Sequence, residues 1–164
     1  MQRSYWLSGR EDVAAAVERA KSEASKLPRL DSVLAVVFLK HTAVPLWGDI
    51  LGSVRSAFPG AEVCGATVDM SVTDGTQWLS PEWGEDSDIL GSLTFMFFER
   101  SSARAMVLPD DPVAAGTMLR QVLDEDADAR AVGLLISDMR VDFNPLFREI
   151  SHVRPEVVFF GGTA

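Results

Sequence analysis

One stretch decides the fold of this chain: Val33-Leu34-Ala35-Val36-Val37-Phe38-Leu39. An apolar run of this length, rich in valine and without polar alternation, is typical of a strand that is covered on both faces. After it, the apolar residues from Leu46 to Phe58 return at the helical period, and Pro59-Gly60 ends the helix. A short strand at residues 61–67 comes next. This order predicts a β-α-β unit in which residues 33–39 form a central strand.

A first amphipathic helix is predicted before this unit. Apolar residues recur every three or four positions from Val13 to Leu27, and Pro28 stops the pattern. Ser8 followed by Glu11 has the spacing of a capping box, in which two side chains satisfy the first backbone amides of a helix. The helix is therefore expected to begin just after Ser8.

On the C-terminal side, residues 89–98 and 103–108 read as strands that are joined by the polar residues 99–102, which predicts antiparallel pairing. Asp111-Pro112 supplies an N-cap and a proline at the first helical position, so a helix is expected from there to about Leu123.

The remaining elements are a strand at residues 131–137, a helix opened by Asn144-Pro145 and a last strand at residues 156–160. The middle residues 69–88 read as a hairpin or long loop. We find no internal repeat in the sequence. The predicted fold class is α/β, a mixed β-sheet with helices packed on it, built from β-α-β units plus a central antiparallel β-meander.

Length and composition narrow the class of protein. The 164 residues suit a single domain, and 47% hydrophobic with 24% charged residues indicates a globular chain. No stretch approaches the roughly 20 apolar residues of a membrane span. The net charge of −9 would repel a phosphate backbone, so no nucleic-acid partner is expected. The single cysteine, Cys64, excludes a cysteine-built zinc site and fits the cytoplasm.

The last residues, 157–164, carry a buried-strand pattern straight into Gly161-Gly162. A strand followed by two glycines is typical of a tight turn at which a ligand or another strand approaches closely. We therefore expect residues 1–164 to be one module of a longer protein.

A ligand is expected at the carboxyl ends of the parallel strands, because loops and helix N-termini converge there in α/β sheets. Four such ends occur, at residues 40–42, 65–67, 137–140 and 161–163. Hydroxyls, one carboxylate, one guanidinium and backbone amides would form a rim that suits a small polar ligand. The ligand-binding residues expected on this rim are Thr67, Ser137, Asp138, Arg140, Gly161, Gly162 and Thr163.

Three motifs resemble those of FIST domains, the sensory module named for F-box and intracellular signal transduction proteins. Val63-Cys64-Gly65-Ala66-Thr67 is similar to the family's glycine-cysteine-serine-threonine turn, and residues 134–138 and 157–164 are similar to its second strand-turn and closing Gly-Gly motif. The order of elements agrees from about residue 35 onward. The resemblance implies an intracellular sensor that binds a small ligand such as an amino acid. It also implies a C-terminal FIST-type partner domain and a signalling effector as partners.

Three other functions stay open. A haem-based nitric oxide sensor would use His41 or His152 as a ligand, although an isolated histidine more often forms ordinary hydrogen bonds. A protein-interaction scaffold would need no small ligand. A hydrolase would use Cys64 or Ser137, but no Gly-x-Ser-x-Gly elbow, phosphate loop or His-Glu-x-x-His helix occurs. A non-catalytic sensor is therefore favoured, with no cofactor and no metal.

Two features of residues 69–88 have a structural and a functional interpretation. Trp78 and Trp83 would form a lid or a docking patch, or would pack against the edge of the sheet. The acidic run at residues 82–88 lacks the alternating ligands and the glycine of a calcium loop, so a solvated loop is preferred.

Overall fold

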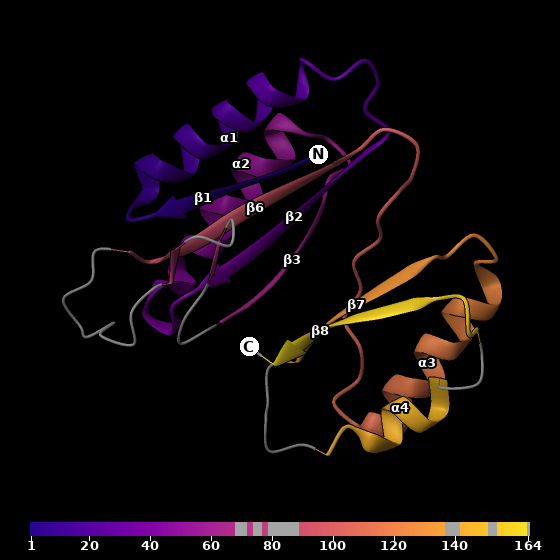
Figure 1. Ribbon diagram of the computed structural model, residues 1–164. Coiled ribbons are helices and arrows are strands. Elements are labelled where there is room, and N and C mark those ends of the chain that lie inside the picture. Colours follow the sequence, from indigo (N-terminus) through magenta and orange to yellow (C-terminus); the bar gives the residue numbers. More distant parts are fainter. Residues whose placement is uncertain (68–71, 74–76, 79–88, 137–141, 151–153, 164) are drawn as a thin grey trace. The chain divides into compact units, whose positions relative to one another are not determined.

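The computed structural model describes residues 1–67, 72–73, 77–78, 89–136, 142–150 and 154–163. The chain divides into two compact units, Met1–Ala105 and Met106–Ala164 (Figure 1), each with its own hydrophobic core. The predicted mixed α/β class is confirmed. That residues 1–164 act as a single module stays a prediction. No helix in the described part of the chain is long and apolar enough to cross a membrane.

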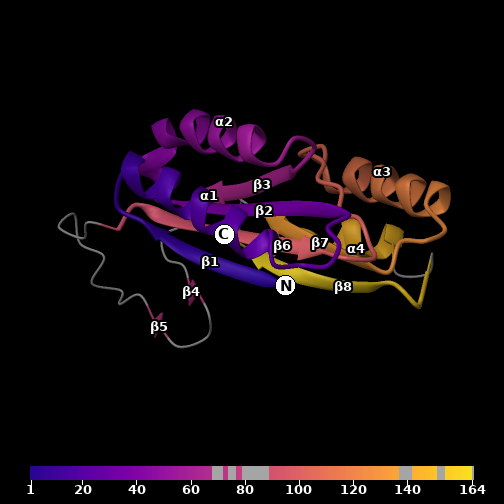
Figure 2. The ribbon, with the colours of Figure 1, turned by 90° about the horizontal axis from the view of Figure 1, so that it is seen from above.

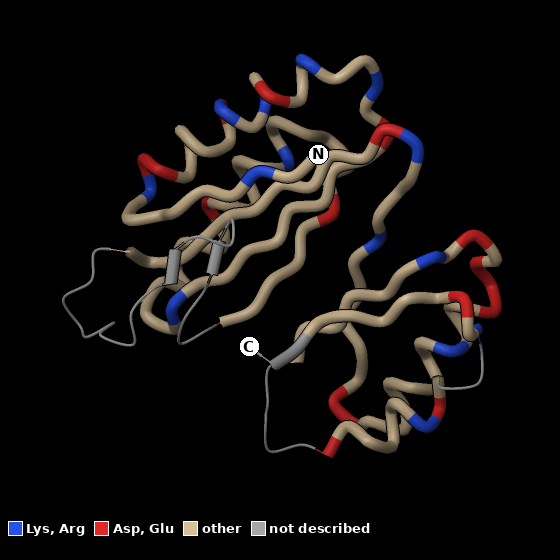
Figure 3. The backbone as a smooth tube through the Cα atoms, viewed as in Figure 1, with Lys and Arg blue, Asp and Glu red and all other residues tan. Residues whose placement is uncertain are grey.

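The first unit is built on a four-stranded sheet with the order β1-β6-β2-β3 (Figure 2). The strands are β1 (Gln2–Leu7), β6 (Gly91–Phe98), β2 (Ser32–Leu39) and β3 (Glu62–Thr67). β2 pairs with β3 in parallel and with β6 antiparallel, so the apolar run that decides the fold is central, as predicted. β2 and β6 carry no charged residue, whereas charges lie along α1 (Arg10–Ala24) (Figure 3).

Two helices cover one face of this sheet: α1 and α2 (Trp47–Ala57), the latter preceded by the 3₁₀ helix η1 (His41–Leu46) (Figure 1). Alternate residues of β2 are buried beneath them, because successive side chains of a strand point to opposite faces. Phe58 packs at ring-centroid distances of 5.7 Å from Phe95 and 5.9 Å from Phe97. These rings anchor the end of α2 to the sheet.

The antiparallel part of the sheet differs from the prediction. Residues 103–108 form no strand, and the partner of β6 is instead β1, which the sequence analysis did not assign. The polar residues of β1 hid its strand character: Gln2, Arg3 and Ser4 give it only a short apolar end. The hairpin expected within residues 69–88 agrees with the antiparallel pairing of β4 (Val72–Thr73) with β5 (Gln77–Trp78).

The start of α1 uses a different acid from the one predicted. The N-cap is Gly9, and both the backbone N–H and the hydroxyl of Ser8 donate to Asp12 Oδ2, at 2.8 and 2.6 Å. Asp12 is the third helical residue, so its carboxylate also lies where the helix dipole favours negative charge. Hydrogen bonds from Ser8 lower the pKa of Asp12. The Glu11 partner that the capping-box spacing predicted is therefore wrong by one position.

The second unit contains α3 (Pro112–Glu125), β7 (Ala131–Ile136), α4 (Asn144–Ile150) and β8 (Val158–Thr163). β7 and β8 are parallel neighbours. The predicted cap is confirmed, since Asp111 Oδ1 accepts a hydrogen bond from the Ala114 backbone N–H at 2.8 Å. Gly161-Gly162 was expected as a turn beyond the last strand, but both residues lie inside β8. The buried core residues of this unit are Ala115, Leu119, Leu123, Leu134, Leu146, Ile150 and Val157.

A single arginine holds the end of α3 to the residues before β8. The Arg154 side chain is 17% exposed and forms an ion pair with Glu156. Its guanidinium donates to four backbone carbonyls, those of Leu123 (3.2 Å), Asp126 (3.1 Å), Ala127 (3.0 Å) and Ala129 (3.3 Å). The last carbonyls of a helix lack partners within the helix, so Arg154 satisfies groups that burial would otherwise penalise.

The two units repeat one backbone plan. Each contains a helix, a strand, a second helix and a parallel strand, in the order α1-β2-α2-β3 and α3-β7-α4-β8. The registers correspond: Leu39 is opposite Thr67 in the first pair, and Ile136 is opposite Thr163 in the second. The sequence shows no internal repeat, so this correspondence lies in the order and pairing of the elements.

Candidate functional site

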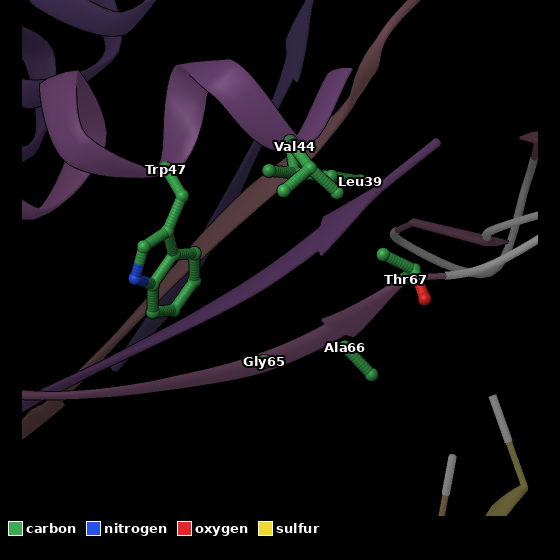
Figure 4. A pocket seen from close by; sticks show the side chains of 6 residues that line it. All are labelled: Leu39, Val44, Trp47, Gly65, Ala66 and Thr67. Carbon is green, nitrogen blue, oxygen red and sulfur yellow. The ribbon is translucent and has the colours of Figure 1, made fainter. Parts of the chain in front are cut away.

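A pocket of about 200 Å³ opens at the carboxyl ends of β2 and β3 (Figure 4). The segment after β2 turns over the sheet as η1, with the Lys40 backbone N–H bonded to Leu90 O at 2.8 Å and the Ala43 N–H to Lys40 O at 2.9 Å. This path places the start of α2 above the strand ends. The lining residues are Leu39, Val44, Trp47, Gly65, Ala66 and Thr67.

Gly65 keeps the floor of the pocket open. A Cβ built at this position would lie 2.0 Å from Val37 O on the neighbouring strand, so no side chain fits there without moving the backbone. The indole of Trp47 extends from the start of α2 toward the two strands, over the part of the sheet that Gly65 leaves bare (Figure 4). The close spacing of β2 and β3 thus requires glycine at position 65. Because glycine has no side chain, the pocket is not filled from this position.

The pocket surface is almost entirely apolar. Leu39 is buried, Trp47 is half-buried and Val44 is 44% exposed at the rim. Thr67 directs its methyl group toward Val44 and Leu39 and turns its hydroxyl away from them (Figure 4). None of the six lining side chains is ionisable. The site can bind an apolar group. Its lining side chains include no nucleophile with a general base beside it.

Comparison with protein-family models matches residues 33–164 to the FIST N domain. This chain belongs to the FIST N-domain family. The family consists of sensory domains of signal transduction. No curated protein and no solved structure matches the chain. The matched region includes both parallel strand pairs, and it begins after α1.

Within this FIST N domain the predicted ligand-binding residues are placed as follows. Thr67 lies at the pocket, opposite Leu39 across the β2–β3 pair. Gly161, Gly162 and Thr163 lie along β8, in register with β7. The other three predicted residues, Ser137, Asp138 and Arg140, lie outside the described residues. The four strand ends thus meet as two pairs, one in each unit.

Sequence reasoning missed the residue that dominates the pocket. Trp47 was assigned to the helical period that ends at Phe58, and the half-exposed face it presents to the strand ends was not considered. Two signals were available, namely a large aromatic residue at the start of a helix and a glycine two positions before the end of the following strand. Only their juxtaposition across the β-α-β unit indicates a pocket.

Of the described candidates for the alternative functions, neither Cys64 nor His41 lines this pocket. Burial, and secondly the charge of Glu62, raises the pKa of the Cys64 thiol, which disfavours the reactive thiolate. His41 is exposed at the start of η1, whereas His152, Trp83 and residues 82–88 lie outside the described residues. No group of three His, Cys, Asp or Glu residues suited to a metal ion occurs in the described segments.

A second hollow, of about 290 Å³, lies beside β1 and α1. Its lining includes Tyr5, Trp6, Asp12 and Arg19. Asp12 already accepts two hydrogen bonds from Ser8, so its carboxylate serves the start of α1. We therefore assign the candidate site to the pocket at the ends of β2 and β3.

Proposed function

We propose that this FIST N domain senses a small organic ligand at the pocket formed by η1, Trp47 and the carboxyl ends of β2 and β3. The domain then passes ligand occupancy to a signalling effector without catalysing a reaction. The observation that carries the proposal is the position of the pocket. It lies at the ends of a parallel strand pair, where ligands of α/β proteins gather, in a chain whose family is sensory.

The lining favours a ligand with an apolar part and a polar part. The apolar part enters between Trp47 and the strands, where desolvation stabilises it by roughly 25 cal/mol per Å² of buried apolar surface. Polar groups of the ligand stay at the mouth, near the Thr67 hydroxyl. An amino acid with an apolar side chain has this division, which agrees with the partner implied by the FIST resemblance.

The non-catalytic assignment follows from the chemistry of the lining. General acid–base and nucleophilic catalysis need ionisable groups or an activated hydroxyl within hydrogen-bond reach of the reacting atoms. The six lining residues offer one hydroxyl, on Thr67, and no base among themselves. We further propose that the domain works in the cytoplasm beside a C-terminal FIST-type partner domain.

A thermal-shift screen tests this function directly. The purified chain is screened against free amino acids, common metabolites and haemin, with a visible spectrum recorded for haemin. A ligand at 100 times its Kd adds about 2.7 kcal/mol to the folded state, which raises Tm by several degrees for a chain of this size. The matched variants are Trp47→Ala, which removes one wall of the pocket, and Leu30→Ala, which removes an apolar side chain outside its lining.

The proposal predicts a shift that Trp47→Ala abolishes and Leu30→Ala preserves. A ligand-induced rise in Tm that persists in Trp47→Ala would show that the ligand binds elsewhere in the chain. A Soret band that depends on His41 would favour the haem sensor.

A further inference from the structure

We propose that the pocket is selective for a planar aromatic ring, and that Trp47 is the specificity-determining residue. This inference rests on the proposed function and names the ligand class of the same site. Three properties of the pocket carry it: an aromatic side chain in the lining, a volume suited to one ring, and walls without charge.

The aromatic surface comes from Trp47, and Gly65 contributes backbone without a side chain. Both residues line the pocket, and the indole extends from the start of α2 toward the strands (Figure 4). The strand spacing requires glycine at position 65, because a Cβ there would lie 2.0 Å from Val37 O and 2.8 Å from Val37 C. A larger residue at this position is therefore incompatible with the present geometry of the sheet.

The volume matches one ring system. The pocket is open to solvent and has a volume of about 200 Å³, whereas a closed apolar cavity of about 150 Å³ holds benzene. A phenyl, phenol or indole group therefore fits, whereas a larger fused system would extend into solvent. The available space thus selects the size of the apolar group.

The walls select against charge and favour aromaticity. Leu39, Val44 and the Thr67 methyl group surround the space, so a charged group entering it would lose hydration without gaining a partner. Trp47 distinguishes a planar ring from an aliphatic group of equal size, because aromatic pairs gain stabilisation beyond the area that they bury. That gain corresponds to a preference of about fivefold in Kd.

Phenol and cyclohexanol are the probes for this inference, because both carry one hydroxyl on a six-membered ring and only phenol is planar. The chain is labelled with [¹⁵N]tryptophan, and the indole N–H signal of Trp47 is assigned by its loss in Trp47→Phe. Each probe is titrated while this signal is followed. We expect saturable shifts of the Trp47 signal, with phenol binding about fivefold tighter than cyclohexanol.

Three variants separate stacking from simple burial. Trp47→Leu keeps an apolar wall and should reduce the preference for phenol to about one, as read from the backbone amide of Gly65 in a uniformly ¹⁵N-labelled sample. Thr67→Val replaces the hydroxyl by a methyl group and should leave the preference unchanged. Trp6→Phe, outside this pocket, should preserve both the affinities and the preference. Far-ultraviolet circular dichroism of each variant verifies the fold.

The outcomes distinguish this inference from the proposed function. Equal affinities of the two probes at the wild-type Trp47 would overturn the ring preference while the pocket remains a ligand site. A preference for phenol that persists in Trp47→Leu would also overturn the role given to Trp47. If neither probe nor any ligand found by thermal shift affects Trp47 or Gly65, the proposed site itself is wrong.

Discussion

The two parallel strand pairs share their backbone plan and differ in what covers it. In the first unit, β2 has β3 on one edge and β6 on the other, whereas among the described residues β7 pairs only with β8. Trp47 begins α2 eight positions after Leu39, and Asn144 begins α4 eight positions after Ile136. An aromatic wall in one unit thus corresponds to a polar residue in the other. In the proposed function, the shared backbone is therefore scaffold, and the residue that begins the second helix of the unit distinguishes the candidate ligand site.

The repeated glycines share one structural cause. Gly65 and Gly161 each lie two positions before a strand-ending threonine, and a Cβ at either would be 2.0 Å from a carbonyl oxygen of the partner strand, Val37 O or Leu134 O. Gly161 also has φ +131°, which side chains rarely adopt. Threonine at the strand end is the second shared feature.

The largest predicted effect tests whether Gly65 and Gly161 have the same structural role. Gly65→Ala and Gly161→Ala should each destabilise their own unit by about 3 kcal/mol, because the added carbon forces the paired strands apart. Hydrogen exchange measured by mass spectrometry, with peptides from each unit, resolves the two effects. The control is Gly52→Ala on α2, where an added Cβ meets no atom within 4 Å, and it should stabilise by up to about 1 kcal/mol. Tolerance of Gly65→Ala would show that the two glycines have different roles.

The next effect concerns a contact that only the second unit has. Arg154→Ala removes the donor of the Leu123 carbonyl and one of two donors from the other three carbonyls, so it should raise hydrogen exchange in α3 and β7, with a loss of about 2 kcal/mol. Arg130→Ala is the matched control: it also donates to the carbonyls of Ala127 and Ala129, but its side chain is 67% exposed. A loss below about 1 kcal/mol is expected there. Equal effects of the two substitutions would contradict the role given to Arg154.

The smallest effect lies at the start of α1, where Ser8 donates two hydrogen bonds to Asp12, whereas α3 begins with the side-chain cap of Asp111. Ser8→Ala should cost about 1 kcal/mol at neutral pH, measured by urea unfolding. Because the Ser8 hydrogen bonds lower the pKa of Asp12 in the folded state, this stabilisation is present above the unfolded pKa of the carboxyl, about 3.9, and is lost as pH falls through the lower folded value. The difference between wild type and Ser8→Ala should therefore shrink in acid. The control Ser22→Ala, on the exposed face of α1, should show no such change.

Much of the fold was predictable because its signals are local. The apolar run of β2, the helical periods of α1 and α2 and the Asp111-Pro112 start of α3 depend on neighbouring residues, and the structure agrees with them. β1 could not be found, since its strand character comes from pairing with β6, about 90 residues away in the chain. The strand expected at residues 103–108 was wrong for the converse reason. Its residues have strand propensity, but propensity does not supply a partner strand.

The candidate pocket lies at a strand end that the sequence predicted, and its lining is apolar. Thr67 lies at the end of a parallel strand, as predicted, whereas Leu39, Val44 and Trp47 form the apolar surface beside it. Side-chain direction decides this difference, because Thr67 turns its methyl group rather than its hydroxyl toward the pocket (Figure 4). The sequence alone does not show which way the Thr67 side chain points. That the seven predicted residues form a ligand-binding rim stays a prediction.

One measurement tests the central claim most directly: a backbone amide chemical-shift map of the whole chain during titration with phenol. The account predicts that the shifts concentrate at Leu39, Val44, Trp47 and residues 65–67 of the first unit, while residues 158–163 of the second unit stay unchanged. Shifts at the β8 end of the second unit, with none around Trp47, would contradict it, because the repeated scaffold and not the aromatic wall would then determine where a ligand binds.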